Sequence, residues 1–220
     1  MPTKRCLEKI LKVECIHLKD RVDRLFWVKK NFNFNFSLFD AVRGLDCKSI
    51  PELSLGETGC LWSHYGAWKA NTEQYDDGNV IFLEDDANPR SNFLDLWNNE
   101  ISHFIPKDFN IIYLGGNLES NNTKYHLVRE YYNKYFFNIR KNNLFRKTNY
   151  WHMTSLSYVL NIKSMKYLLS KFDSIESYIP LDHFLTQTLY ELDPSKVYHS
   201  DPVMFNSRTS QSSIIHSHYL

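Results

Sequence analysis

Three consecutive acidic residues, Glu84, Asp85 and Asp86, are the part of this chain whose types and spacing most clearly suggest chemistry. They follow a bulky apolar run at residues 80–83 and precede Ala87-Asn88-Pro89, which contains two turn-forming residues. This pattern predicts a buried strand that ends in a turn. Clustered carboxylates repel one another and lose hydration beside an apolar core. A hard divalent cation would relieve both costs because it prefers oxygen ligands, and it usually keeps positions open for substrate phosphates. A solvated acidic loop after a strand would account for the segment equally well.

Two arginines add to this interpretation. Arg21 and Arg24 follow a predicted first strand at residues 13–18 by one short turn. Guanidinium groups at such a strand end can fork onto phosphate oxygens, whereas the plainer alternative is a pair of solvated charges at the start of a helix. An acidic cluster that needs a cation favours the first alternative, because carboxylates, a divalent metal and arginines together suit a diphosphate ligand.

Three further polar residues are weaker candidates for a site. Ser63 and His64 lie in a predicted helix, where adjacent side chains face different directions, so they do not form a catalytic dyad. A lone histidine in such a helix is more often packed in the core than bound to a ligand. Asp182 opens a predicted helix at residues 181–192, where it either caps the helix or projects into a cleft as a base. On its own, capping is the better interpretation.

The composition indicates a globular chain without a nucleic-acid footprint. Its 220 residues are 43% hydrophobic and 15% aromatic, which suffices for a sizeable core. Lysine and arginine number 26 against 25 acidic residues, and nucleic-acid binding would need a basic excess. No apolar run approaches the ~18–20 residues of a membrane span, and residues 1–13 do not resemble a signal peptide. We therefore expect a cytoplasmic protein, with a host secretory compartment left open.

The cysteines and the absent motifs exclude several classes of protein. No two of the four cysteines have C-x-x-C spacing, so the sequence does not predict a zinc site; they are Cys6, Cys15, Cys47 and Cys60. Cys15 and Cys60 lie in apolar runs and are expected to be buried thiols in a reducing compartment. The chain contains neither G-x-x-x-x-G-K-[ST] nor G-x-G-x-x-G nor G-x-S-x-G. These absences argue against an NTPase, a kinase, a dinucleotide-dependent oxidoreductase and an α/β-hydrolase.

The elements that must position these residues alternate along the chain. Apolar patterning predicts strands at residues 13–18, 37–42, 80–83, 110–114, 152–160, 197–199 and 203–205. Helical spacing predicts helices at residues 23–31, 60–71, 93–104, 164–172 and 181–192, with residues 56–59 preceding the second helix. Such alternation indicates an α/β sheet with helices on both faces, whose ligands bind beyond the carboxyl ends of the strands. Residues 117–150 form a lid or a long surface excursion.

Several segments, taken in order, resemble glycosyltransferase family 25, which includes lipooligosaccharide and procollagen galactosyltransferases. Residues 15–24 (CIHLKDRVDR) are similar to its N-L-x-R-R-x-D-R stretch, and residues 39–44 (FDAVRG) to its A-V-D-G segment. Residues 55–68 (LGETGCLWSHYGAW) are close to its G-E-x-G-C-x-x-S-H-x-x-x-W signature, and residues 80–86 (VIFLEDD) match its L-E-D-D strand end. Weaker similarity continues through residues 157–169, 180–185 and 212–214.

The resemblance implies a GT-A-like fold and a transferase activity. Residues 1–220 would form a single domain, with a nucleotide-sugar-binding part at residues 1–116 and an acceptor-side part at residues 117–220. The activity implied is metal-dependent transfer of a hexose, galactose or glucose, from a UDP-sugar with inversion. The acceptor would be a hydroxyl on a glycan or on a hydroxylysine-type protein side chain. No oligomeric state is implied.

The resemblance also implies a metal site at the acidic run. Asp86 would be a direct metal ligand and Glu84 would point toward the metal or the ribose, with Asp85 beside the donor. The ion implied is Mn²⁺. A third protein ligand is not evident; His199 is a candidate, although the end of a short predicted strand favours a surface position.

Other positions that match the family carry roles by the same resemblance. Arg21 and Arg24 would line the nucleotide pocket, and Ser63 and His64 would lie near the donor. Asp182 would be the base that accepts the acceptor's proton, because the family has an acidic residue at that helix start.

Two alternative functions stand beside the transferase. The first is a non-catalytic carbohydrate-binding or scaffold module on the same fold. The intact acidic run argues against it, because a protein that had lost catalysis would be free to lose these clustered acids. The second is a metal-dependent phosphoesterase, which usually needs more histidines in ligand spacing than this chain offers.

Overall fold

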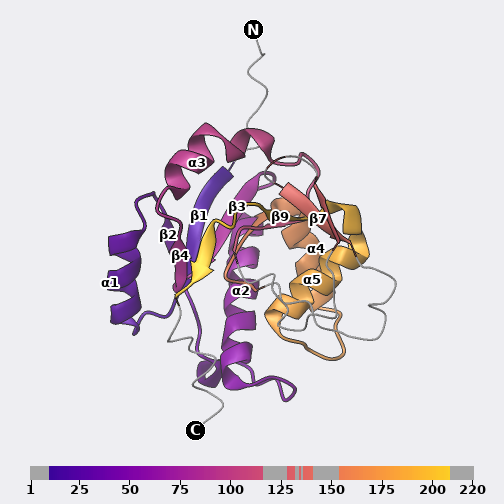
Figure 1. The fold of residues 1–220 in the computed structure, drawn as a ribbon. Helices are drawn as coiled ribbons and strands as arrows, with labels where there is room; N and C mark the ends of the chain where they lie inside the picture. Colours follow the sequence, from indigo (N-terminus) through magenta and orange to yellow (C-terminus); the bar gives the residue numbers. More distant parts are fainter. Residues whose placement is uncertain (1–9, 116–127, 132–133, 135, 141–153, 209–220) are drawn as a thin grey trace.

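The computed structural model describes residues 10–115, 128–131, 134, 136–140 and 154–208, and within these residues the centre of the molecule is an eight-stranded sheet (Figure 1). Its strand order is β2-β1-β3-β8-β5-β9-β7-β6. The strands are β1 (Ile10–His17), β2 (Ser37–Asp40), β3 (Asn79–Glu84), β5 (Ile111–Tyr113), β6 (Val128–Tyr131), β7 (Phe136–Arg140), β8 (Ser157–Asn161) and β9 (Val197–Ser200). A second sheet pairs β4 (Ala87–Pro89) with β10 (Phe205–Ser207).

Most strands of the large sheet run in one direction. Strand β1 is parallel to β2 and β3, and β5 is parallel to β9. Strand β8 is antiparallel to β3 and β5, and β7 is antiparallel to β9 and β6, so only β8 and β7 are reversed among these eight. The prediction of an α/β sheet is confirmed.

Helices cover both faces of the sheet (Figure 1). Helices α2 (Leu55–Gln74), α4 (Ile162–Phe172) and α5 (Leu181–Leu192) pack on one face, and α1 (Val22–Asn31) and α3 (Phe93–Asn99) pack on the other. Strand β3 serves both layers because its side chains alternate: Val80 and Phe82 join the core under α2, and Ile81 and Leu83 join the core under α3. Burial on both faces explains why this strand is a continuous apolar run.

Helix α2 begins earlier than its spacing predicts. Residues 56–59, expected to precede the helix, form its first turn, because Ser54 and Glu57 make a capping box. The Glu57 amide donates to the Ser54 Oγ (3.3 Å), and the Ser54 amide donates to the Glu57 Oε2 (2.9 Å). The S-x-x-E pattern of a capping box is visible in the sequence at residues 54–57. The prediction placed the helix start too late because it relied on apolar spacing alone.

Other elements differ from their predictions in extent. Residues 87–89, expected to be a turn, form β4 because the distant β10 pairs with them. The helix predicted at residues 93–104 divides into α3 and a 3₁₀ turn, η2 (Ile101–Phe104). The remaining described elements include two further 3₁₀ turns, η1 (Gly44–Asp46) and η4 (Pro194–Lys196). Residues 117–150, expected to form a lid or a long surface excursion, lie outside the described residues apart from β6, Lys134 and β7, as do residues 212–214.

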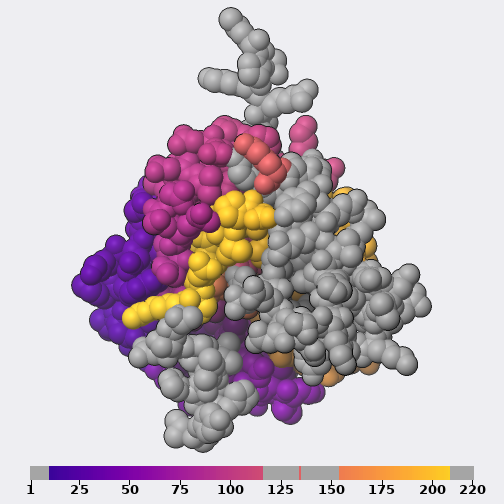
Figure 2. Space-filling view, viewed as in Figure 1, coloured from indigo at the N-terminus to yellow at the C-terminus, as the bar shows by residue number. Residues whose placement is uncertain are grey.

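The carboxyl ends of β1 and β3 and the start of β8 meet at one edge of the large sheet. Residues Ile16 and Glu84 are register partners on β1 and β3, and Leu83 is paired with Ser157 at the start of β8. In the space-filling view the C-terminal described residues, in yellow, lie beside the magenta residues of the α3 region (Figure 2). Among the described residues, every helix is too short or too polar to cross a lipid bilayer.

Gly59 of α2 provides a test of how this helix is seated. A Cβ at Gly59 would lie 2.7 Å from the Gly44 amide nitrogen and 2.8 Å from the Val42 carbonyl oxygen, both rigid backbone atoms. We expect Gly59→Ala to lower the free energy of unfolding by ~2 kcal/mol or more. The matched control is Gly66→Ala on the same helix, where the Cβ would meet the Phe39 ring at 3.2 Å. Because that ring can move and alanine favours a helix, its urea midpoint should equal or exceed the wild-type value; equal losses in both variants would contradict this account.

Candidate active site

The acidic run lies where β3 ends, and it is not a solvated loop. Glu84 is the last residue of β3, and Asp85 and Asp86 connect it to β4. The exposed fractions of Asp85 and Asp86 are only 5% and 8%, so the alternative of a solvated acidic loop is wrong. Two buried carboxylates require compensating charge or hydrogen bonds.

Asp85 receives that compensation from two directions. The His17 Nδ1 lies 2.9 Å from the Asp85 Oδ2, and the Arg24 Nη1 forms an ion pair with the Asp85 Oδ1. The same Arg24 nitrogen lies 3.7 Å from the Asp86 Oδ2. Arg24 is itself 6% exposed, so one buried guanidinium serves two buried carboxylates. The position of Arg24 is set by α1, whose first turns follow the carboxyl end of β1.

Glu84 points to different partners. The Ser155 hydroxyl donates to the Glu84 Oε1 (2.5 Å), and the His64 Nε2 lies 3.8 Å from the same oxygen. Burial, followed by the charge of Asp86, raises the pKa of Glu84 from 4.5 to about 8. Glu84 therefore holds a proton over much of the neutral range when no cation is bound.

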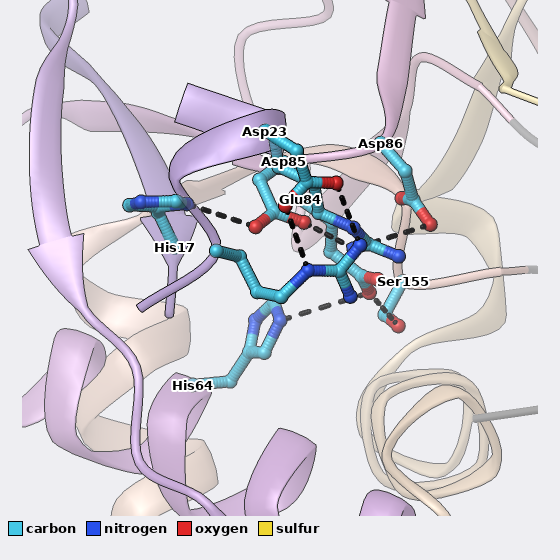
Figure 3. Close-up of polar contacts among 9 residues, drawn as sticks. His17, Asp23, His64, Glu84, Asp85, Asp86 and Ser155 are labelled. Atoms are coloured by element: carbon cyan, nitrogen blue, oxygen red, sulfur yellow. Dashed lines mark hydrogen bonds and ion pairs between the residues drawn. The ribbon is translucent and has the colours of Figure 1, made fainter. Parts of the chain in front are cut away.

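The three carboxylates consequently do not converge on one point (Figure 3). Asp85 faces His17 and Arg24, while Glu84 faces Ser155 and His64. Asp86 keeps one oxygen, Oδ1, that is buried without a hydrogen-bond partner. Because a buried carboxylate oxygen without a donor is costly, Asp86 and the neighbouring Glu84 fit a divalent cation better than Asp85 does.

His64 reaches this edge from α2. Its Nδ1 is hydrogen-bonded to the Tyr158 hydroxyl, and its ring stacks on the Tyr158 ring at a centroid distance of 5.6 Å. The Trp68 Nε1 donates to the same hydroxyl (3.2 Å). Burial lowers the pKa of His64 to about 3, so the imidazole is neutral. Its Nε2 is buried without a hydrogen-bond partner, which is unusual for a packed histidine.

The structure also places three residues at this edge that the sequence analysis did not single out for a site: Cys60, His17 and Ser155. The ligand atoms of Cys60, His64 and Glu84 lie within 4.8 Å of one another. The signal available in the sequence was the i, i+4 spacing of Cys60 and His64, which brings both to one face of a helix. His17 and Ser155 gave no local signal, because their roles depend on strand pairing.

Arg21 and Ser63 are engaged in local contacts. Arg21 donates two hydrogen bonds to Asp23, from Nε to Oδ1 and from Nη2 to Oδ2, each 2.9 Å long, and its side chain remains 28% exposed. Ser63 is 2% exposed, and its hydroxyl donates to the Gly59 carbonyl (2.6 Å) and accepts from the Val42 amide (3.0 Å). Ser63 thus ties α2 to the segment after β2, while Arg21 retains a partly free surface near the acidic run.

Asp182 and His199 complete the set of predicted site residues. Asp182 lies in the first turn of α5, where its Oδ1 accepts the His183 amide (2.9 Å), and burial raises its pKa. Its charge acts on Cys60 and on Tyr113, which indicates a position on the α2 side of the sheet edge. The surface position expected for His199 is wrong: it is 1% exposed, because β9 lies between β5 and β7 in the sheet.

The cysteine prediction is only partly confirmed. Cys15 is fully buried, whereas Cys60 is partly exposed. Both are free thiols, and burial raises the pKa of each.

Comparisons with known proteins agree with the fold. The sequence model described as "Glycosyltransferase family 25 (LPS biosynthesis protein)" matches residues 11–185. No curated protein sequence shows significant similarity to this chain. A solved glycosyltransferase involved in the glycosylation of the major capsid of PBCV-1 superposes with a TM-score of 0.51 and 9% identity, covering 94% of this chain and 96% of that one. The 4-diphosphocytidyl-2C-methyl-D-erythritol synthase of Anaerococcus prevotii DSM 20548 has a TM-score of 0.45 at 15% identity, over 96% and 81% of the two chains, and adds nothing to the fold assignment.

The raised pKa of Glu84 makes a prediction about stability. With divalent ions chelated, the folded protein keeps a proton on Glu84 up to about pH 8, whereas the unfolded chain loses it near 4.5. The free energy of unfolding should therefore fall as pH rises through this window, and Glu84→Gln should remove that part of the slope. Relative to wild type, we expect the free energy of unfolding of Glu84→Gln to rise by ~3–4 kcal/mol between pH 5 and pH 8, measured by chemical unfolding. Glu73→Gln, on the exposed side of α2, is the control; a pH-independent difference for Glu84→Gln would contradict the assignment.

Proposed function

Because the chain belongs to glycosyltransferase family 25, we propose that it transfers a hexose, galactose or glucose, from a UDP-sugar to an acceptor hydroxyl. The acceptor would be a glycan or a hydroxylysine-type protein side chain, and the transfer would invert the anomeric centre. The observation that carries the proposal is the family match over residues 11–185, which includes the acidic strand end. The burial of Asp85 and Asp86 supports it, because a scaffold module would gain nothing from this costly arrangement.

The donor would bind at the carboxyl edge where β1 and β3 end. A divalent cation, Mn²⁺ by the family resemblance, would be held by Asp86 and Glu84 and would neutralise charge on the donor diphosphate. Arg21 is the better placed of the two arginines to contact a phosphate, because its side chain is partly exposed while Arg24 is buried against two carboxylates. Arg24 would then act by holding Asp85 and Asp86 in place. His17 and Arg24 together fix the rotamer of Asp85.

The acceptor would be activated on the α5 side of the same edge. Two observations support Asp182 as the base. It lies at the start of α5, and burial raises its pKa, which makes its carboxylate a stronger proton acceptor. The His183 amide holds one oxygen of Asp182, so the other oxygen is the one available to the acceptor hydroxyl. His64 and Ser63 would contribute through α2, His64 by its contact with Glu84 and Ser63 by seating the helix.

A donor screen tests the proposed reaction. The purified protein is incubated with each UDP-sugar, with Mn²⁺ or with EDTA, and UDP release is measured with and without candidate glycan and hydroxylysine acceptors. We expect release from one UDP-hexose that depends on Mn²⁺ and that Asp86→Asn lowers at least ~100-fold. Asp76→Asn, in an exposed turn, should leave the rate unchanged. Release that persists in EDTA would exclude the metal role, and release from none of the donors with any acceptor would count against the transferase.

The role of Asp182 has a separate kinetic test. Asp182→Asn should lower kcat by ~10²–10⁴-fold with little change in the KM for the donor, since the proton acceptor is lost and the donor contacts remain. The control is Glu191→Gln, an exposed position on the same helix. An ordinary kcat in Asp182→Asn would assign the base elsewhere, provided that circular dichroism shows both variants folded.

A further inference from the structure

A second set of metal-ligand atoms shares Glu84 with the acidic run but adds sulfur and nitrogen ligands to it. Helix α2 carries Cys60 and His64 one turn apart on the same face, and both point toward Glu84 at the end of β3. The Cys60 sulfur, a His64 ring nitrogen and a Glu84 oxygen all lie within 4.8 Å of one another. Thiolate, imidazole and carboxylate are the three ligand types that zinc accepts in proteins.

The His64 Nε2 is the observation that points to a missing partner. This nitrogen is buried and has no hydrogen-bond partner among the described residues, and His64 as a whole is 0% exposed. The Glu84 Oε1, 3.8 Å away, is too distant for a hydrogen bond. Two ligands of a tetrahedral zinc ion are about 3.3–3.6 Å apart, so an ion between these atoms needs only small side-chain shifts.

The surroundings hold the three side chains in place. The other ring nitrogen of His64 is hydrogen-bonded to the Tyr158 hydroxyl, which also accepts from the Trp68 Nε1. Metal-binding histidines commonly use their second nitrogen in this way, because the bond fixes the ring and leaves the first nitrogen for the metal. Ser155 contacts Glu84 and also interacts with the Cys60 thiol. The ligands are thus oriented by neighbours on α2, on β8 and just before β8.

We propose that Cys60, His64 and Glu84 bind a divalent ion of the zinc class, with one coordination position open at the carboxyl edge of the sheet. Sulfur and nitrogen ligands select zinc or cobalt over the hard Mn²⁺ ion. Three protein ligands leave a fourth coordination position on a tetrahedral ion. That position faces the side of Glu84, whose side chain is 23% exposed, and not the side of His64, whose side chain is buried. An ion there would bridge α2 to the end of β3, and binding would release the thiol proton of Cys60.

This site is distinct from the cation of the proposed function, although both involve Glu84. The proposed donor cation uses oxygen ligands and the diphosphate, whereas the zinc-class ion needs neither nucleotide nor sugar. A binding measurement without nucleotide therefore tests this inference alone, and its failure would leave the proposed transfer reaction untouched.

Cobalt titration provides the test, because Co²⁺ replaces zinc in such sites and reports a bound thiolate by charge-transfer absorption in the near ultraviolet. The full-length protein is treated with EDTA, freed of chelator and titrated with Co²⁺ under reducing conditions. We expect a saturable thiolate band at one equivalent, abolished by added Zn²⁺ and unaffected by an equal concentration of Mn²⁺. No thiolate band, or a band that Mn²⁺ removes equally well, would overturn the proposal.

Substitutions identify the ligands. Cys60→Ser should abolish the band, and Glu84→Gln should retain it while weakening Co²⁺ binding at least ~10-fold. Cys47→Ser is the matched control, because Cys47 is a free thiol outside the cluster; it should keep the full band. Zn²⁺ should raise the melting temperature of the wild type and of Cys47→Ser but not of Cys60→Ser. Circular dichroism confirms that each variant is folded, and an unchanged band in a folded Cys60→Ser protein would overturn the assignment.

Discussion

The buried ion pairs of Arg24 with Asp85 and Asp86 are the interaction on which this sheet edge depends. Two carboxylates at the end of a buried strand would repel each other and push the strand end outward. One guanidinium from α1 compensates both, and His17 on β1 orients the nearer one. The ion pairs therefore join α1 to the turn after β3, and the hydrogen bond between His17 and Asp85 joins that turn to β1. Removing only one member would leave an uncompensated buried charge, which costs more than the pair contributes.

Helix α2 supplies the other half of the edge, and its position follows from two small residues. Gly59 packs against the backbone at Gly44, which lets the helix approach the segment after β2 more closely than a side chain would allow. The Ser63 hydroxyl then ties the helix to Val42. Because His64 is the next residue, this close approach also sets where the imidazole stands relative to Glu84. The glycine and the serine thus act on the site through backbone geometry.

The sequence predicted the architecture and the buried strand that ends in the acidic run, but not the orientation of the acidic side chains. A continuous apolar run ending in Glu84 was enough to place a buried strand, because burial on both faces leaves that pattern. Whether Asp85 turns toward Arg24 or toward a ligand depends on the packing of α1 against β1, which is a long-range property. His199 was misplaced for the same reason: its exposure is decided by strands paired on either side of β9. The start of α2 could have been predicted from the sequence, because its capping box involves only residues 54–57.

The pairing of β4 with β10 brings the last described residues of the chain into contact with the acidic run. Strand β4 begins directly after Asp86, and β10 is followed by Arg208, whose amide donates to the Asp86 carbonyl (2.9 Å). Just before β10, the Met204 amide donates to the Leu114 carbonyl (2.7 Å), and a Cβ at Gly115 would collide with the Phe205 carbonyl. The late segment is therefore clamped between two strand ends. The order of the acidic turn and the order of residues 204–208 are thus thermodynamically linked. A ligand that binds at the acidic turn would slow amide hydrogen exchange at residues 204–208.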